Sequence, residues 1–156
     1  MLLSLLSVAL LGVFVVLLMY LAVSNGVFGD VPTQEELTDL SNAEASEVYS
    51  ADGVLLGRYY IENRTDVKYN EVNPFLINAL IATEDARFYE HEGVDQISLL
   101  RVLFKSIIMG QNKGGGSTLS QQLAKNIYGR KNYGVLTMPV NKMREAIIAN
   151  RMEQVY

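Results

Sequence analysis

The chain opens with an uncharged apolar run from Leu2 to Val23, and this run constrains the possible folds more than any other feature. Its 22 residues would span about 33 Å as an α-helix, enough to cross the hydrocarbon core of a bilayer. A secretory signal peptide is the alternative, but its apolar region is usually about 7–15 residues long and ends in a small-residue cleavage site. The segment MYLAVSNGVFGD offers no clear site of that kind. We therefore predict an uncleaved transmembrane anchor over 2–23.

Charge is distributed unevenly along the 156 residues. Residues 30–57 carry seven acidic side chains and no Lys or Arg, whereas residues 101–156 carry nine Lys or Arg against two Glu. A basic C-terminal half beside a membrane anchor suits lipid head groups or a lipid-linked phosphate rather than nucleic acid, and a solvated basic face is the simpler alternative. The chain has no Cys and one His, which excludes disulfides and zinc sites built from several Cys or His ligands.

Residue patterns after the anchor predict a linker and then a β-hairpin. Residues 24–44 are rich in Ser, Asn, Asp, Gly and Glu with little periodicity, so we expect a short stalk with one helical turn. The dipeptide Asp52-Gly53 lies between two runs of β-prone residues, which predicts a hairpin with strands at 47–51 and 54–61.

Start and stop signals predict four helices, opening near Pro74, Asp95, Thr118 and Pro139. Asn73 is a favourable N-cap before Pro74, and Thr118 stands three residues before Gln121 in the capping-box arrangement. The second helix is expected to end at Gly110 and the fourth to continue to Tyr156. An apolar stripe on the first helix is expected to face a core, and it comprises Phe75, Leu76, Ala79, Leu80 and Thr83.

The segment IATEDARFYEHEG, residues 81–93, places four carboxylates and the only histidine within nine residues. Glu84 stands one residue beyond the apolar stripe, where partial burial would make a carboxylate a competent general base near neutral pH. A salt bridge to Arg87 or a helix cap is the structural alternative. We interpret His91 as a hydrogen-bonding scaffold residue rather than a proton shuttle.

Two further motifs follow. In KGGGSTLSQQLAKN, three glycines precede hydroxyl side chains at a predicted helix start, which suits phosphate binding by backbone N–H groups, and Lys125 could add charge. No Lys directly follows the last glycine, so this is not a nucleotide P-loop, and a flexible loop with an ordinary N-cap is the alternative. Downstream, Lys142 and Glu145 share a helix face, a pairing that is usually surface decoration.

In this order, the motifs resemble the peptidoglycan glycosyltransferase domain, glycosyltransferase family 51, of class A penicillin-binding proteins and monofunctional transglycosylases. ATEDARFYEHEGVD resembles the first motif of that family, GGSTLSQQLAKN the second, and Lys142-Met-Arg-Glu145 the core of the third. Two features depart from the family pattern. Asn141 stands where the family usually has Arg, and the connection from Lys125 to Lys142 is a few residues longer than usual.

The resemblance implies a mainly α, lysozyme-like domain with a small β-hairpin over 45–156, expected to be the N-terminal part of a longer domain. It would follow one transmembrane helix and the linker. The implied activity is polymerisation of lipid II with inversion and release of undecaprenyl pyrophosphate, on the outer face of the cytoplasmic membrane. No cofactor is required, although Mg²⁺ or Mn²⁺ assists some members. The implied partners are lipid II, the growing lipid-linked glycan strand, membrane lipids and cell-wall synthesis proteins.

By motif position, the resemblance makes Glu84 the general base and Glu145 a second carboxylate near the acceptor or the departing pyrophosphate. The substrate-binding residues it implies are Ser117, Thr118, Gln121, Gln122, Lys125, Asn126, Arg130 and Lys142, with Lys131 an alternative to Arg130. Asp85, Phe88 and His91 would hold the base in place, and no metal ligands are predicted. The alternatives are a membrane-anchored muramidase or lytic transglycosylase and a non-catalytic, truncated membrane-anchored fragment.

Overall fold

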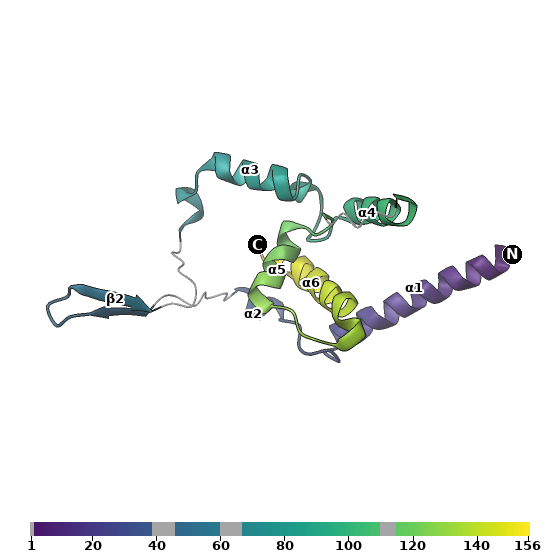
Figure 1. The fold of residues 1–156 in the computed structure, drawn as a ribbon, viewed down its shortest axis with the longest axis horizontal. Helices are drawn as coiled ribbons and strands as arrows, with labels where there is room; N and C mark the ends of the chain where they lie inside the picture. The colour runs from purple at the N-terminus through teal and green to yellow at the C-terminus, as the bar shows by residue number, and fades with distance from the viewer. Residues whose placement is uncertain (1, 39–45, 60–66, 110–114) are drawn as a thin grey trace.

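A computed structural model describes residues 2–38, 46–59, 67–109 and 115–156, and helices dominate them, as predicted (Figure 1). The elements in chain order are α1 (Leu2–Ser24), α2 (Gln34–Thr38), β1 (Ser46–Tyr49), β2 (Leu55–Tyr59), η1 (Tyr69–Glu71), α3 (Pro74–Glu84), η2 (Phe88–Glu90), α4 (Gln96–Met109), α5 (Leu119–Tyr128), η3 (Gly134–Leu136) and α6 (Thr137–Glu153). Within α1, Leu6–Ser24 is long and apolar enough to cross a membrane, with a mean hydropathy of 2.8.

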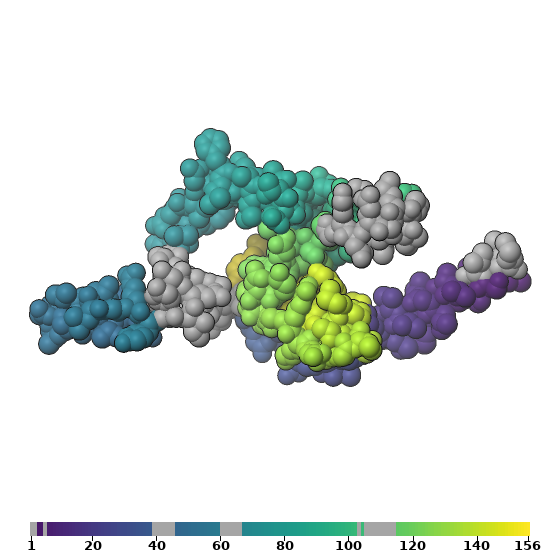
Figure 2. All heavy atoms as spheres, in the orientation of Figure 1, coloured from purple at the N-terminus to yellow at the C-terminus, as the bar shows by residue number. Residues whose placement is uncertain are grey.

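The predicted β-hairpin is present and projects away from the helices (Figures 1 and 2). Strands β1 and β2 pair antiparallel, and Gly53 takes a φ of 81° in the connecting turn, a conformation that glycine adopts without strain. Both strands are shorter than predicted, and the predicted strand residues 60–61 lie outside the described residues.

Helix α3 begins as predicted, but its apolar stripe does not face a core. The Asn73 side chain accepts a hydrogen bond from the backbone N–H of Phe75 at 2.9 Å, and Pro74 occupies the first turn. Phe75 is 82% exposed and Leu76 63% exposed, and the remaining stripe residues Ala79, Leu80 and Thr83 are exposed as well. Figure 1 shows the reason: α3 runs clear of α5 and α6 and approaches them only at its C-terminal end.

Helix α6 is the centre of the core. One cluster joins it to α2 and α5 through Leu37, Ala124, Ile148 and Met152, and a second joins it to the end of α1 through Val23, Val140 and Ile147. The boundaries of α6 differ from the prediction. The helix begins at Thr137, two residues before Pro139, and this start is possible because proline is tolerated within the first turn of a helix. The helix ends at Glu153 rather than Tyr156.

The described part of the predicted stalk, residues 24–38, lies against α6 and contributes to the core, and its single helical turn is α2. The Arg144 guanidinium is buried and donates to the carbonyls of Phe28, Gly29 and Asp30 at 3.0–3.1 Å. Arg151, two turns further along α6, donates to the carbonyls of residues 31 and 32 at 3.2 and 2.7 Å. Hydrogen bonds from charged donors are among the stronger ones in proteins, so residues 28–32 are held along the helix.

The loop after η2 approaches α6 at Gly93. A Cβ added at Gly93 would lie 2.6–2.7 Å from the backbone of Ala149 and Asn150, and the φ of this glycine is +80°. Its carbonyl accepts a hydrogen bond from the buried Thr118 hydroxyl at 2.6 Å. The same residue therefore fixes the loop to both α5 and α6.

We predict that Gly93→Ala lowers the free energy of unfolding by about 2–4 kcal/mol, because the new methyl group collides with helix backbone and the φ disfavours an L side chain. Chemical denaturation of the detergent-solubilised protein measures this change. Gly57→Ala is the matched control, since a Cβ at Gly57 meets nothing within 4 Å. Equal stability of the two variants would contradict the close packing of the loop on α6.

Candidate active site

A cavity of about 370 Å³ lies between the end of α3, the start of α5 and the middle of α6. The side chains around it are mostly polar or charged. Its lining residues are Thr83, Glu84, Gly115, Ser117, Gln121, Gln122, Lys125, Arg130, Lys142 and Glu145. The three sequence motifs, which are separated by up to about sixty residues, therefore meet at one place.

Glu145 is buried between two cations. Its Oε1 accepts a hydrogen bond from Arg130 Nε at 2.7 Å and its Oε2 accepts one from Lys142 Nζ at 2.8 Å, while the Glu145 side chain is 5% exposed. Burial raises the pKa of the Glu145 carboxyl, but the hydrogen bonds and positive charges of Arg130 and Lys142 outweigh it and hold this pKa below the usual value. The pair of Lys142 and Glu145 is therefore not surface decoration: the carboxylate is enclosed and kept ionised by two cations.

Lys142 also donates to the Ser117 hydroxyl at 2.8 Å. This bond ties the loop before α5 to α6, because Ser117 directly precedes the N-cap residue Thr118. The cation therefore has two oxygen partners and a side chain that is still 41% exposed. Lys142 is positioned by the protein and remains accessible to an anion in the cavity.

Glu84 is the last residue of α3 and lines the same cavity. Its side chain is exposed, so the predicted partial burial beside an apolar stripe is wrong, for the same reason that the stripe itself is exposed. The alternative salt bridge is not seen either, since Arg87 pairs with Asp95 at 2.8 Å and with Glu90 at 3.7 Å. Among the described residues, Glu84 accepts one hydrogen bond, from Gln122 Nε2 at 3.1 Å.

Asp85, the residue after Glu84, is buried and fixes the chain at the end of α3. Its Oδ2 accepts a hydrogen bond from the backbone N–H of Leu119 at 3.0 Å, and both of its oxygens lie 3.1 Å from Nε2 of His91. The His91 ring packs edge-on against Phe88, with 6.3 Å between ring centroids. The contacts of Asp85 place Glu84, the residue before it, beside α5.

Three backbone N–H groups at the start of α5, those of Thr118, Leu119 and Gln121, are used within the protein. Thr118 caps the helix as predicted: its hydroxyl accepts from the backbone N–H of Gln121 at 3.2 Å, and the N–H of Thr118 donates to the Gln121 side chain at 3.2 Å. The N–H of Leu119 is bonded to Asp85. Of the N–H groups at the predicted phosphate site, that of Leu119 is therefore taken by a carboxylate of the chain. The positive charge in the cavity comes instead from side chains.

Two of the predicted substrate-binding residues lie away from this cavity. Thr118 is 2% exposed and turns its hydroxyl to Gly93, and Asn126 is exposed outside the lining. Lys113 of the glycine-rich motif lies outside the described residues. Between Arg130 and Lys131, which the sequence could not separate, the structure places Arg130 in the lining.

Asp95 stands at the start of α4, as predicted, and it also forms an ion pair with Arg87. It caps α4 by accepting from the N–H groups of Ile97 and Ser98 at 3.0 and 3.1 Å, and it pairs with Arg87 through two hydrogen bonds of 2.8 and 3.1 Å. Burial raises the pKa of Asp95, but the bonds from Ser98 and Arg87 outweigh it and lower this pKa to about 2. The sequence signal that could have predicted this ion pair was an acidic helix cap with an Arg eight residues earlier.

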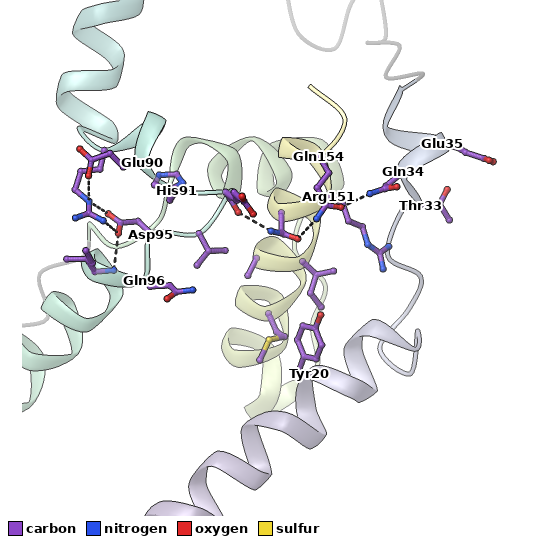
Figure 3. Close-up of a pocket in the computed structure, with 18 residues that line it drawn as sticks. Tyr20, Thr33, Gln34, Glu35, Glu90, His91, Asp95, Gln96, Arg151 and Gln154 are labelled. Carbon is purple, nitrogen blue, oxygen red and sulfur yellow. Dashed lines mark hydrogen bonds and ion pairs between the residues drawn. The ribbon is translucent and has the colours of Figure 1, made fainter.

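A second cavity, of about 1210 Å³, lies between another face of α6, the linker and the loop after η2 (Figure 3). A row of amides crosses its wall. Gln34 donates to Gln154 at 2.6 Å, Gln154 to Asn150 at 3.1 Å, and Asn150 to the carbonyl of Glu92 at 3.1 Å. None of the predicted catalytic or substrate-binding residues lines this cavity.

Comparison with known proteins gives one family. Residues 52–156 match the family model described as Transglycosylase. Penicillin-binding protein 1A of Escherichia coli K12 is 35% identical over 124 residues, covering 80% of this chain and 14% of that protein. Penicillin-binding protein 1A of Aquifex aeolicus is 32% identical over 146 residues, covering 94% and 19%. Penicillin-binding protein 1F of Bacillus subtilis is 39% identical over 112 residues, covering 72% and 15%. The chain spans less than a fifth of the length of each of these relatives.

We predict that Asp95 makes stability depend on acid pH. Its folded pKa of about 2 lies below the ordinary 3.8, so its stabilisation, about 2 kcal/mol, is fully present above about pH 4 and is lost as the pH falls toward 2. Asp95→Asn should lower the free energy of unfolding by at least that amount at neutral pH and flatten its dependence between pH 4 and 2. Chemical denaturation at a series of pH values measures both effects.

Glu90→Gln is the matched control for this prediction, because Glu90 is the exposed partner of the same Arg87. An exposed ion pair contributes about 0–1 kcal/mol, so this variant should keep most of the stability and all of the acid dependence. A similar loss in both variants would show that Arg87, rather than the buried Asp95, dominates the effect.

Proposed function

Because the chain belongs to the transglycosylase family, we propose that it forms part of a peptidoglycan glycosyltransferase that polymerises lipid II. One observation carries this proposal. A single cavity is lined by an exposed carboxylate, Glu84, and by three cations, Lys125, Arg130 and Lys142. Transfer of a sugar from a pyrophosphate-linked donor needs a base for the attacking hydroxyl and positive charge for the departing anion. The cavity supplies both.

In the proposed reaction, Glu84 takes the proton from the 4-hydroxyl of the acceptor GlcNAc. The oxygen attacks C1 of the donor MurNAc, the bond from C1 to the pyrophosphate oxygen breaks, and undecaprenyl pyrophosphate leaves with inversion at C1. Glu84 suits the base because its carboxylate has one neutral amide donor, Gln122, among the described residues and faces the cavity.

Glu145 has a different role in the proposed reaction. Each of its oxygens already accepts a hydrogen bond from a cation, and these bonds keep it ionised, so it is a poor acceptor for a further proton. Its charge holds the Arg130 and Lys142 side chains at the cavity wall before substrate arrives. Cations fixed in advance stabilise a developing anion without the cost of reorganising them during the reaction.

The other lining side chains complete the donor site in this proposal. Lys125 adds the third positive charge from α5, and the Ser117 hydroxyl and the amides of Gln121 and Gln122 offer neutral hydrogen bonds to sugar or phosphate oxygens. Among the described residues no group of three or more His, Cys, Asp or Glu side chains could hold a metal ion. In this proposal no cofactor is required, and Mg²⁺ or Mn²⁺ would only assist the reaction.

The location and partners are also part of the proposal. We place α1 in the cytoplasmic membrane as a single anchor, with the cavity on the outer face, where lipid II and the growing lipid-linked strand would reach it beside the membrane lipids. The partners would include other proteins of cell-wall synthesis. A muramidase or lytic transglycosylase is not favoured, because a hydrolase acting on an uncharged polymer has no need of three cations beside the base. The family match does not favour a non-catalytic fragment.

We predict that Glu84→Gln abolishes lipid II polymerisation by the full-length protein, with a loss of at least about 100-fold in kcat/KM, because the amide cannot accept the hydroxyl proton. Polymerisation of fluorescent lipid II, followed by gel electrophoresis of the glycan strands, measures this loss. Glu92→Gln is the control, since Glu92 lies outside the cavity lining. Wild-type rates in Glu84→Gln would overturn the assignment of the base, and release of muropeptides from purified sacculi would favour the muramidase alternative.

We predict that Lys125→Ala raises the KM for the lipid II donor about tenfold or more, because one of the three charges facing the pyrophosphate is lost. Initial rates at varied donor concentration measure this change. Lys131→Ala tests the specificity of the effect. Lys131 is a nearby cation, on the connection from α5 to α6, but it lies outside the cavity lining. An unchanged donor KM in Lys125→Ala, or an equal rise in Lys131→Ala, would argue against a pyrophosphate site at this wall.

A further inference from the structure

Asn141 is a buried polar side chain with every hydrogen-bonding group of its amide in use. It is 2% exposed, and its Nδ2 donates to the carbonyls of Lys131 and Thr137 at 2.8 and 2.7 Å. Its Oδ1 accepts from the backbone N–H of Lys131 at 3.1 Å. The Asn141 amide thus binds both the N–H and the C=O of one residue in the loop between α5 and α6, in the manner of a neighbouring strand.

The residue held in this way follows Arg130 directly. Arg130 reaches from that loop to Glu145, where its Nε donates to Oε1 at 2.7 Å. Asn141 and Glu145 are four residues apart on α6, so they lie on one face about one helical turn, or roughly 5–6 Å, from each other. One turn of α6 therefore holds the loop backbone at Asn141 and the guanidinium of Arg130 at Glu145.

The chemistry of position 141 requires an amide. A side chain that bonds both N–H and C=O of the same residue must offer an acceptor and a donor, which Asn does and which Arg or Lys, with donors alone, cannot. Asn is an unfavourable residue within a helix, so its place inside α6 costs helix stability that the three hydrogen bonds offset. The loop also needs Gly129, whose φ of +64° turns the chain at the end of α5 just before Arg130.

We infer that Asn141 is a positioning residue for the proposed glycosyl transfer: it holds the backbone beside Arg130 so that the guanidinium faces the donor pyrophosphate from the cavity wall. This inference rests on the proposed function and adds the means by which one of its three cations is fixed. Asn141 itself does not touch substrate, because it is buried and lies outside the cavity lining. Its effect passes through Arg130.

A double-mutant cycle on the full-length protein tests the inference. Arg130→Ala is expected to lower kcat/KM for lipid II by about 10–100-fold, chiefly through KM for the donor, and Asn141→Ala by about tenfold in the same parameter. In the double variant, kcat/KM should equal that of Arg130→Ala within about twofold, since Asn141 has nothing left to position. A loss in the double variant that equals the product of the two single losses would overturn the inference.

Thr137→Val is the matched control for a merely structural role. The Thr137 hydroxyl also fixes the same loop, by accepting from the N–H of Tyr133 at 2.8 Å, but it does not bond the residue next to Arg130. Thermal unfolding is expected to show a loss of stability for this variant, with the donor KM unchanged. Should Asn141→Ala fail to fold because of the space it leaves, Asn141→Leu carries the same cycle, because it keeps roughly the side-chain volume, adds no buried charge and loses all three hydrogen bonds.

Binding of inorganic pyrophosphate separates this inference from the proposed function. Calorimetric titration of the detergent-solubilised full-length protein is expected to show weaker binding in Asn141→Ala and in Arg130→Ala, by about the same factor, and no further weakening in the double variant. Absence of lipid II polymerisation in the wild type would reject the proposed function while leaving this result interpretable. Unchanged pyrophosphate binding in Asn141→Ala, with binding lost in Arg130→Ala, would overturn the positioning role alone.

Discussion

The structure depends on the need to satisfy three polar side chains that α6 buries within five residues. Asn141, Arg144 and Glu145 are each 6% exposed or less, and a buried polar group without partners costs several kcal/mol when it is charged. Each recruits a different part of the chain: Asn141 takes the loop after α5, Arg144 the linker after α1, and Glu145 the cations Arg130 and Lys142. The apolar clusters pack α1, α2 and α5 on this helix, but the polar contacts decide the register of the loop and the linker.

The same constraint explains why two carboxylates of one cavity differ. Glu145 is enclosed and ionised because a buried carboxylate must be paired, whereas Glu84 is solvated at the exposed end of α3. Burial with paired cations suits Glu145 to organise charge, and exposure with one amide neighbour leaves the lone pairs of Glu84 free for a substrate proton. The different roles of Glu84 and Glu145 thus follow from their positions, one at the exposed end of α3 and the other on a buried face of α6.

Signals confined to one helical turn or one hairpin could be predicted from the sequence. The caps at Asn73 and Thr118 and the Asp52-Gly53 turn are confirmed, because their partners lie two to four residues away. Partners across long separations could not be predicted in the same way. The periodic stripe of α3 carried no information on whether another element covers it, and Arg144 bonds the linker more than a hundred residues earlier. Residues from all three motifs line one cavity, whereas Asn141 was visible only as a departure from the family pattern.

The linker contacts fix helix α1 to α6 instead of leaving it on a flexible connection. Every backbone carbonyl from Phe28 to Pro32 is held by a guanidinium of α6, and Arg144, which holds three of them, adjoins Glu145. To move α1 relative to α6, five hydrogen bonds from charged donors would first have to break. In the proposed arrangement, the fold would therefore set the depth of the cavity relative to the head groups, and a lipid-borne pyrophosphate would meet the three cations at one fixed height.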